Sequence, residues 1–252
     1  MLNRANDATA TSRAEPLVND ALRLSVMGTF QFWVADESLP TLPGGSQRLL
    51  AFLALRQRAV TRSAAAGTLW PDSTESHASS SLRSALSRLE DVTRHAVVAT
   101  PIDVSFAEHV SVDLRHARTI AHRLIDRDAA HLPSDLSSDA IAALSTDLLP
   151  DWYDDWVVIE SEDWRQLRLH ALEAIAARLT EQRRSGEAIQ AALAVVGTEP
   201  LRESGHAALI RAHLAEGNQS EALTVYTKYA STLHDELGIQ PTVGLQSLVP
   251  SL

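Results

Sequence analysis

Apolar residues recur along this chain with two different periods, and each period predicts a different kind of element. Residues 22–34 (LRLSVMGTFQFWV) alternate between apolar and polar positions and are rich in strand-forming residues, which predicts one or two short strands. Apolar residues then recur every three to four positions, the spacing of helices with one buried face. This second pattern predicts three helices, at about residues 47–58, 64–70 and 77–91.

Hydroxyl-bearing residues mark the expected starts of the first two helices. Ser46 is a plausible N-cap for the first helix and Ser63 for the second, because a serine oxygen can accept a hydrogen bond from a free N–H group. Between these helices, Val60–Thr61 predicts a brief extended step. The third helix is followed by short apolar groups that predict the strands of a hairpin, at Val97–Val98, Ile102–Phe106 and Val110–Val112.

The third predicted helix has the composition of a helix that reads DNA. Arginine can bond guanine edges and phosphates, and serine is small enough to let the backbone approach a groove. An ordinary amphipathic helix has the same pattern, but strands, three helices and a hairpin, in this order, form a winged helix-turn-helix, whose third helix lies in the recognition position. Its buried face carries Leu82, Ala85, Leu86 and Leu89, and its opposite face carries Ser80, Arg83, Ser84, Ser87 and Arg88.

From Asp113 onward the pattern is helical, with glycine-containing turns between the helices. Glu187–Ala188 and Glu221–Ala222 stand 34 residues apart, which is the period of the tetratricopeptide repeat. The predicted fold class is therefore mainly α with small β elements: an N-terminal winged helix-turn-helix and a C-terminal all-α tetratricopeptide-like helical repeat domain. The predicted division is a flexible N-terminal tail at 1–21, a winged-helix DNA-binding domain at 22–112 and an activation domain at 113–252. The expected back-half helices lie at about 113–128, 135–146, 160–184, 186–197, 201–215 and 219–236.

The distribution of charge along the chain says more about DNA binding than the net charge of −10 does. Residues 46–94 carry seven arginines against four carboxylates, whereas residues 113–252 carry 12 basic and 21 acidic side chains. DNA phosphate repels an acidic surface, so the back half is expected to face away from DNA or to bind another partner. The chain has neither a cysteine, an apolar run of membrane-spanning length nor a signal peptide, which favours a cytoplasmic protein, associated with the nucleoid when bound to DNA.

The remaining candidate chemistry is weak, so we expect neither catalytic residues nor a cofactor or metal site. The aromatic cluster in LLPDWYDDW is interpreted as packing at a domain junction, with a ligand-stacking surface as the alternative. The histidines lack the spacing of a zinc site, and the aspartates lack that of a calcium loop. The residues concerned are Trp152, Tyr153 and Trp156, then His170, His206 and His213, then Asp151, Asp154 and Asp155.

A collinear set of segments in both halves carries a family resemblance. The segments are SQRLLAFLAL at 46–55, AGTLWPD at 66–72, SLRSALSRL at 81–89, LLPDWYDDWV at 148–157, EPLRESGHAALIRAHLAEGN at 199–218 and DELGIQP at 235–241. With these segments the chain resembles the Streptomyces antibiotic regulatory protein (SARP) family of transcriptional activators. The family joins an OmpR-type winged helix to a bacterial transcriptional activation domain.

The resemblance implies a function and a set of contacts. Members bind promoter direct repeats as side-by-side protomers and recruit RNA polymerase holoenzyme, without a cofactor. Carried over by position, the groove-facing candidates are Ser80, Arg83, Ser84, Ser87 and Arg88. The phosphate-contact candidates are Arg48, Thr61, Arg62 and Arg94.

Two departures from the family pattern weaken the expected DNA affinity. Glu90 and Asp91 follow the third helix, where the helix dipole disfavours negative charge. The hairpin turn TPID at 100–103 has no arginine, so the usual basic wing tip is missing. We therefore expect weak binding by one protomer, strengthened by a repeated site or by polymerase. The alternative is a protein-interaction scaffold with a degenerate winged helix; an enzyme is the third and least supported class.

Overall fold

Two small sheets and a series of helices form the protein in a computed structural model that describes residues 22–126 and 128–249, so the predicted tail at 1–21 lies outside the described residues. The first sheet has the order β3-β2-β1-β7. Strands β1 (Leu22–Ser25), β2 (Gln31–Val34) and β3 (Glu37–Ser38) are antiparallel neighbours, and β7 (Ser111–Val112) pairs in parallel with β1.

The prediction that β7 belongs to the hairpin is wrong, and Asp113 supplies the reason. Its carboxylate accepts hydrogen bonds from the backbone N–H groups of Val26 and Met27 and from the hydroxyl of Ser25, at 2.5–3.1 Å. These bonds hold the chain beside the end of β1, so β7 joins the first sheet. A charged hydrogen bond to backbone N–H groups contributes about 1.5–3 kcal/mol.

The three predicted helices of the front half are present, with shifted ends. They are α1 (Gly44–Leu55), α2 (Arg62–Leu69) and α3 (Glu75–Ser87). Ser46 is not an N-cap: it is buried inside α1, and its hydroxyl donates to the Ala85 carbonyl of α3 at 3.2 Å. Thr61, and not Ser63, caps α2, because its hydroxyl accepts from the Ala64 N–H.

The prediction that the third helix extends to residue 91 is also wrong. A separate short helix, α4 (Asp91–Arg94), begins there with Glu90 as its N-cap. The carboxylates of Glu90 and Asp91 therefore lie at the N-terminus of α4, where the helix dipole stabilises negative charge. The destabilisation predicted for these two residues at the end of the third helix is thus replaced by a favourable interaction. The Arg94 guanidinium donates to the Ser87 and Leu89 carbonyls, which satisfies backbone groups at the end of α3.

The second sheet contains the wing. Its order is β4-β6-β5, with β4 (Val60–Thr61), β5 (Val97–Ala99) and β6 (Asp103–Phe106) all antiparallel to their neighbours. β5 and β6 form the predicted hairpin, and its turn is closed by the Thr100 hydroxyl, which accepts from the N–H groups of Ile102 and Asp103.

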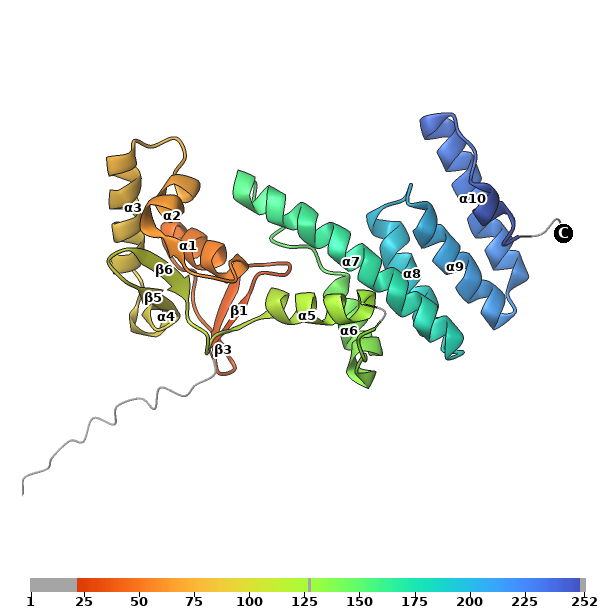
Figure 1. Ribbon diagram of the computed structural model, residues 1–252, viewed down its shortest axis with the longest axis horizontal. Helices are drawn as coiled ribbons and strands as arrows, with labels where there is room; N and C mark the ends of the chain where they lie inside the picture. Colours follow the sequence, from red (N-terminus) through yellow and green to blue (C-terminus); the bar gives the residue numbers. More distant parts are fainter. Residues whose placement is uncertain (1–21, 127, 250–252) are drawn as a thin grey trace, which may run out of the picture.

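Helices that pack in sequence order form the back half, extending from the sheets in Figure 1. Helices α8 and α10 begin 34 residues apart, and Ala188 and Ala222 are both fully buried near these starts. These matched positions agree with the predicted repeat, and the fold class is confirmed. The elements are α5 (Asp113–Ile125), η1 (Pro133–Leu136), α6 (Ser138–Leu144), α7 (Asp155–Glu181), α8 (Ser185–Thr198), α9 (Glu203–Glu216), α10 (Gln219–Leu237) and α11 (Val243–Gln246).

One continuous apolar core runs from the first sheet into α8 and α9, and aromatic residues cross the junction between the two halves. Trp152 stacks on Phe30 with ring centroids 5.8 Å apart, and Trp156 meets Phe52 edge-on at 5.5 Å. Tyr153, in contrast, is 84% exposed. The predicted junction packing therefore holds for the two tryptophans and not for the tyrosine.

Ion pairs reinforce this junction. Glu160 of α7 binds Arg56, which directly follows α1, at 3.0 Å and Arg118 of α5 at 2.9 Å, and Arg48 of α1 pairs with Asp154. The carboxylate of Glu160 is about 15% exposed, so water screens it only partly. The front half is thus held against the helical half by both apolar and charged contacts.

Candidate nucleic-acid interface

Helix α3 presents the predicted polar face to solvent. Leu82, Ala85 and Leu89 are buried against the rest of the front half. On the other side, Arg83 donates to the Ser80 hydroxyl at 2.9 Å, a contact that orients its guanidinium along the helix. The structure thus brings together all five groove-facing candidates, with four exposed and Ser80 half-buried: Ser80, Arg83, Ser84, Ser87 and Arg88.

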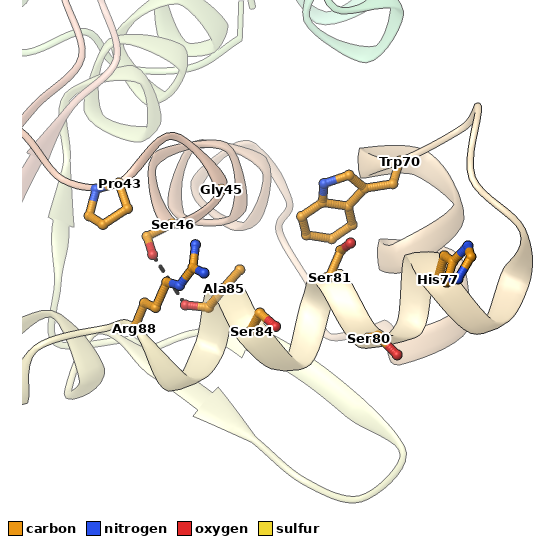
Figure 2. Close-up of a pocket in the computed structure, with 10 residues that line it drawn as sticks. All are labelled: Pro43, Gly45, Ser46, Trp70, His77, Ser80, Ser81, Ser84, Ala85 and Arg88. Atoms are coloured by element: carbon orange, nitrogen blue, oxygen red, sulfur yellow. Dashed lines mark hydrogen bonds between the residues drawn. The ribbon is translucent and has the colours of Figure 1, made fainter.

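A hollow lies beside this face, between α3 and the first turn of α1 (Figure 2). In Figure 2 the Trp70 indole lies above Ser81, and the Arg88 side chain extends beneath the start of α1. The first backbone N–H groups of a helix attract anions, and Gly45 puts no side chain over them. The hollow therefore combines a helix start, an indole and an arginine next to the exposed face of α3.

Sequence reasoning missed Trp70, His77 and the start of α1 as parts of this surface. Trp70 directly follows α2, and its ring lies beside α3 in Figure 2. The amphipathic pattern of α3 places its own side chains, but it contains no information about which other element lies beside them. The only sequence feature that pointed to this surface was Trp70 directly before Pro71, at the end of the second helix.

Thr61 and Arg62 lie beside the wing turn, because Thr61 pairs with Asp103, the first residue after that turn. The Arg62 N–H donates to the Ile102 carbonyl at 2.8 Å, and its guanidinium reaches the Thr100 carbonyl at 3.3 Å. A cation therefore stands beside the wing turn, although the turn itself contains no basic residue. Thr61 uses its hydroxyl to cap α2.

Ion pairing separates Arg48 from the other arginine candidates. Arg48 is paired with Asp154 at the junction of the two halves. Within residues 22–126 and 128–249, no ion pair involves Arg62, Arg83, Arg88 or Arg94. These four guanidinium groups thus retain their charge for an external anion, and they come from α2, α3 and α4.

No three His, Cys, Asp or Glu residues among the described positions are grouped as metal ligands would be. Likewise, none of the described helices has the length and apolarity needed to cross a membrane.

Comparison with known proteins identifies the back half. The family model of the bacterial transcriptional activator domain matches residues 110–252, more than half of the chain. The chain belongs to this family. Its activator domain thus covers the helices from α5 to α11, together with β7.

Two relatives extend the similarity across the winged helix as well as the activator domain. The regulatory protein AfsR of Streptomyces coelicolor (strain ATCC BAA-471 / A3(2) / M145) is 29% identical over 249 residues, which cover 93% of this chain and 24% of AfsR. AfsR of Streptomyces griseus is 27% identical over 253 residues, which cover 92% of this chain and 24% of the relative. The chain spans about a quarter of the length of these relatives.

A solved structure shows the same fold. Mycobacterium tuberculosis EmbR, in complex with a low affinity phosphopeptide, superposes with a TM-score of 0.63 at 24% identity, over 91% of this chain and 64% of EmbR. The EmbR structure thus shows the shared fold, whereas the activator domain and the AfsR similarity support the resemblance to the SARP family. The matched family is a type of transcriptional regulator and not a class of enzyme.

Proposed function

We propose that the protein is a sequence-specific DNA-binding activator that binds promoter direct repeats through α3. The supporting observation is the set of four unpaired guanidinium groups described above, on and around an exposed helix in the recognition position. Other arginines of this protein, such as Arg48 and Arg123, are in contrast paired with carboxylates. An arginine without a carboxylate partner remains available for phosphate or a guanine edge.

In this proposal the contacts divide into two kinds. Ser80, Arg83, Ser84, Ser87 and Arg88 face the major groove, with the arginines as base readers. Thr61, Arg62 and Arg94 contact phosphates, Arg62 from beside the wing turn. The hollow beside α3 accommodates a further phosphate at the start of α1. We assign Arg48 to the junction and not to DNA, because Asp154 neutralises it.

The helical half, residues 113–252 in the predicted division, is proposed to contact RNA polymerase holoenzyme. In Figure 1 helices α8 to α10 lie at the far end of the molecule from α3, so an acidic surface there is kept away from DNA phosphate. Side-by-side protomers on a repeated site would compensate for the wing turn, which adds no cation of its own.

The reading role of α3 is tested by replacing Arg83 or Arg88 with alanine. Each change is expected to cost about 1–3 kcal/mol of specific binding if the arginine reads a base. Binding is measured by fluorescence anisotropy on the DNA upstream of the protein's own gene and on unrelated DNA. Arg211→Ala, on the exposed side of α9, is the matched control and should bind as the parent does. Parental binding by both α3 variants would contradict the proposal.

A second candidate function is a protein-interaction scaffold, and the wing is the observation that favours it. Ile102 at the wing turn is 70% exposed and Val98 is 52% exposed, a surface better suited to a protein than to phosphate. A gel shift at low salt separates the two functions. Absence of any retardation, with or without polymerase holoenzyme, would favour the scaffold and contradict DNA recognition.

A further inference from the structure

A second cleft lies at the junction of the two halves, apart from the hollow beside α3. Its walls come from α1, from α2 with the following Pro71, and from the first turns of α7. It has a volume of about 410 Å³, which lies within the usual range of small-molecule sites, about 300–1,000 Å³. Because both halves contribute residues, anything bound here touches the winged helix and the activator domain together.

Two nitrogen donors of the cleft residues lack acceptors. Among the described residues, neither the indole Nε1 of Trp156 nor the Nε of Arg48 has a hydrogen-bond partner, and both atoms are shielded from solvent. Trp156 is only 5% exposed. Buried donors are almost always satisfied, and leaving one unpaired costs about 1–3 kcal/mol. The two N–H groups would therefore gain from an acceptor oxygen supplied by a ligand.

The charges of the cleft favour an uncharged ligand. Arg48 pairs with Asp154 and Arg56 pairs with Glu160, so both cations are already neutralised within the protein. Asp155 adds a further negative charge at the start of α7. An anion would meet no free cation among the described cleft residues, and a cation would find no buried carboxylate without a partner.

The walls provide apolar contact for the body of such a ligand. Ile159 is 64% exposed although it lines the cleft, and Pro71 and Thr68 lie opposite on the α2 side. Apart from its chain neighbours and the backbone of its own helix, no described atom lies within 4 Å of the position that a Cβ on Gly67 would occupy. This open space above α2 is where the ligand body would lie.

We propose that this cleft, hereafter the junction cleft, binds a small uncharged molecule with an apolar body and a carbonyl oxygen that accepts from Trp156. Access requires a small rearrangement, because the indole nitrogen is covered. The Arg48 side chain is about 32% exposed and can change rotamer at the mouth. A ligand that contacts α2 and α7 at once would stabilise the joined arrangement of the two halves.

The experiment uses nitrogen-15-labelled full-length protein and cyclohexanecarboxamide as the probe. The chain has five tryptophans, so it gives five indole N–H resonances, and Trp156→Phe identifies the one from Trp156. Titration with the amide is expected to move that resonance downfield, as a hydrogen bond forms, and to leave those of Trp33 and Trp164 unchanged. No movement up to the solubility limit of the amide would overturn the proposal.

Two comparisons make the test specific. Gly67→Leu fills the cleft and is expected to weaken binding of the amide by about tenfold or more. Gly186→Leu, at another helical glycine with open space before it, is the matched control and should bind as the parent does. Equal weakening by both glycine variants would place the amide elsewhere. Tighter binding of cyclohexanecarboxylate than of the amide would overturn the uncharged chemistry.

Discussion

Single polar residues in this protein take roles that their position along the chain does not reveal. His206 lies on α9 between a backbone carbonyl and an aromatic ring: its Nε2 is 2.9 Å from the Pro200 carbonyl, and its ring stacks on Tyr229 at 4.1 Å. Its Nδ1 is buried and has no partner among the described residues. Burial disfavours the charged form and lowers the pKa of His206, and it outweighs the bond to the Pro200 carbonyl, which acts in the opposite direction.

This burial predicts a pH dependence of stability. Because the folded-state pKa of His206 is below its unfolded value near 6.5, the unfolded state binds the proton more readily. The contribution of the neutral ring is therefore fully present above pH 6.5 and is lost as the pH falls through the folded pKa. His206→Phe keeps the ring stacking and removes the titration, so urea unfolding between pH 7 and pH 5 should show a flatter profile. An unchanged slope would contradict this role; His109→Phe, at an exposed position, is the control.

At the scale of elements, the contact between α8 and α9 depends on a glycine. A Cβ on Gly205 would lie 2.6 Å from Cγ1 of Val195, which is closer than atoms in proteins approach. Helix α9 can therefore pack this closely on α8 only because position 205 has no side chain. The same argument does not apply to Gly186. Apart from its chain neighbours and its own helix backbone, no described atom lies within 4 Å of the position that a Cβ there would occupy.

Gly205→Ala is accordingly expected to destabilise the protein by about 1–3 kcal/mol, because the two helices must move apart or Val195 must leave its rotamer. Gly186→Ala is expected to be neutral or to stabilise by up to about 1 kcal/mol through the unfolded state. Chemical unfolding monitored by circular dichroism measures both. Similar effects of the two changes would show that α8 and α9 are not packed as described.

The sequence predicted the helices of the front half well and the pairing of one strand wrongly. The periodic pattern predicted the three front helices because each buries a regular apolar face, as Leu82 and Leu89 do in α3. It misplaced β7 because strand pairing depends on Asp113, a contact across 87 positions that no local pattern contains. The α3 side chains of the candidate site were predictable for the same local reason, whereas the approach of Trp70 and α1 depends on tertiary packing.

At the scale of the molecule, the contacts at the junction hold the winged helix and the helical half in a fixed arrangement. Glu160 is the residue on which two cations from different elements converge, Arg56 from the front half and Arg118 from the back half. Its carboxylate oxygens bind one arginine each. Removing that charge leaves two guanidinium groups close together without their shared partner.

Glu160→Gln is expected to lower stability by about 1–3 kcal/mol and to reduce transcription activation more than it reduces DNA affinity, since α3 keeps its own contacts. Anisotropy on promoter DNA and transcription with purified polymerase holoenzyme measure the two effects separately. Glu181→Gln, at an exposed position on the same helix, serves as the control. Equal losses of affinity and activation would show that the junction is needed for DNA binding itself.

The Asp113 contact with the end of β1 also has a consequence for biosynthesis. The ribosome makes β1 first, yet the carboxylate that bonds Ser25, Val26 and Met27 is not synthesised until 87 residues after Val26. β7, the parallel neighbour of β1, is equally late. The winged helix therefore cannot complete its first sheet until the activator domain has begun to emerge, and a nascent chain stopped at residue 110, before β7, would expose an unfinished sheet edge.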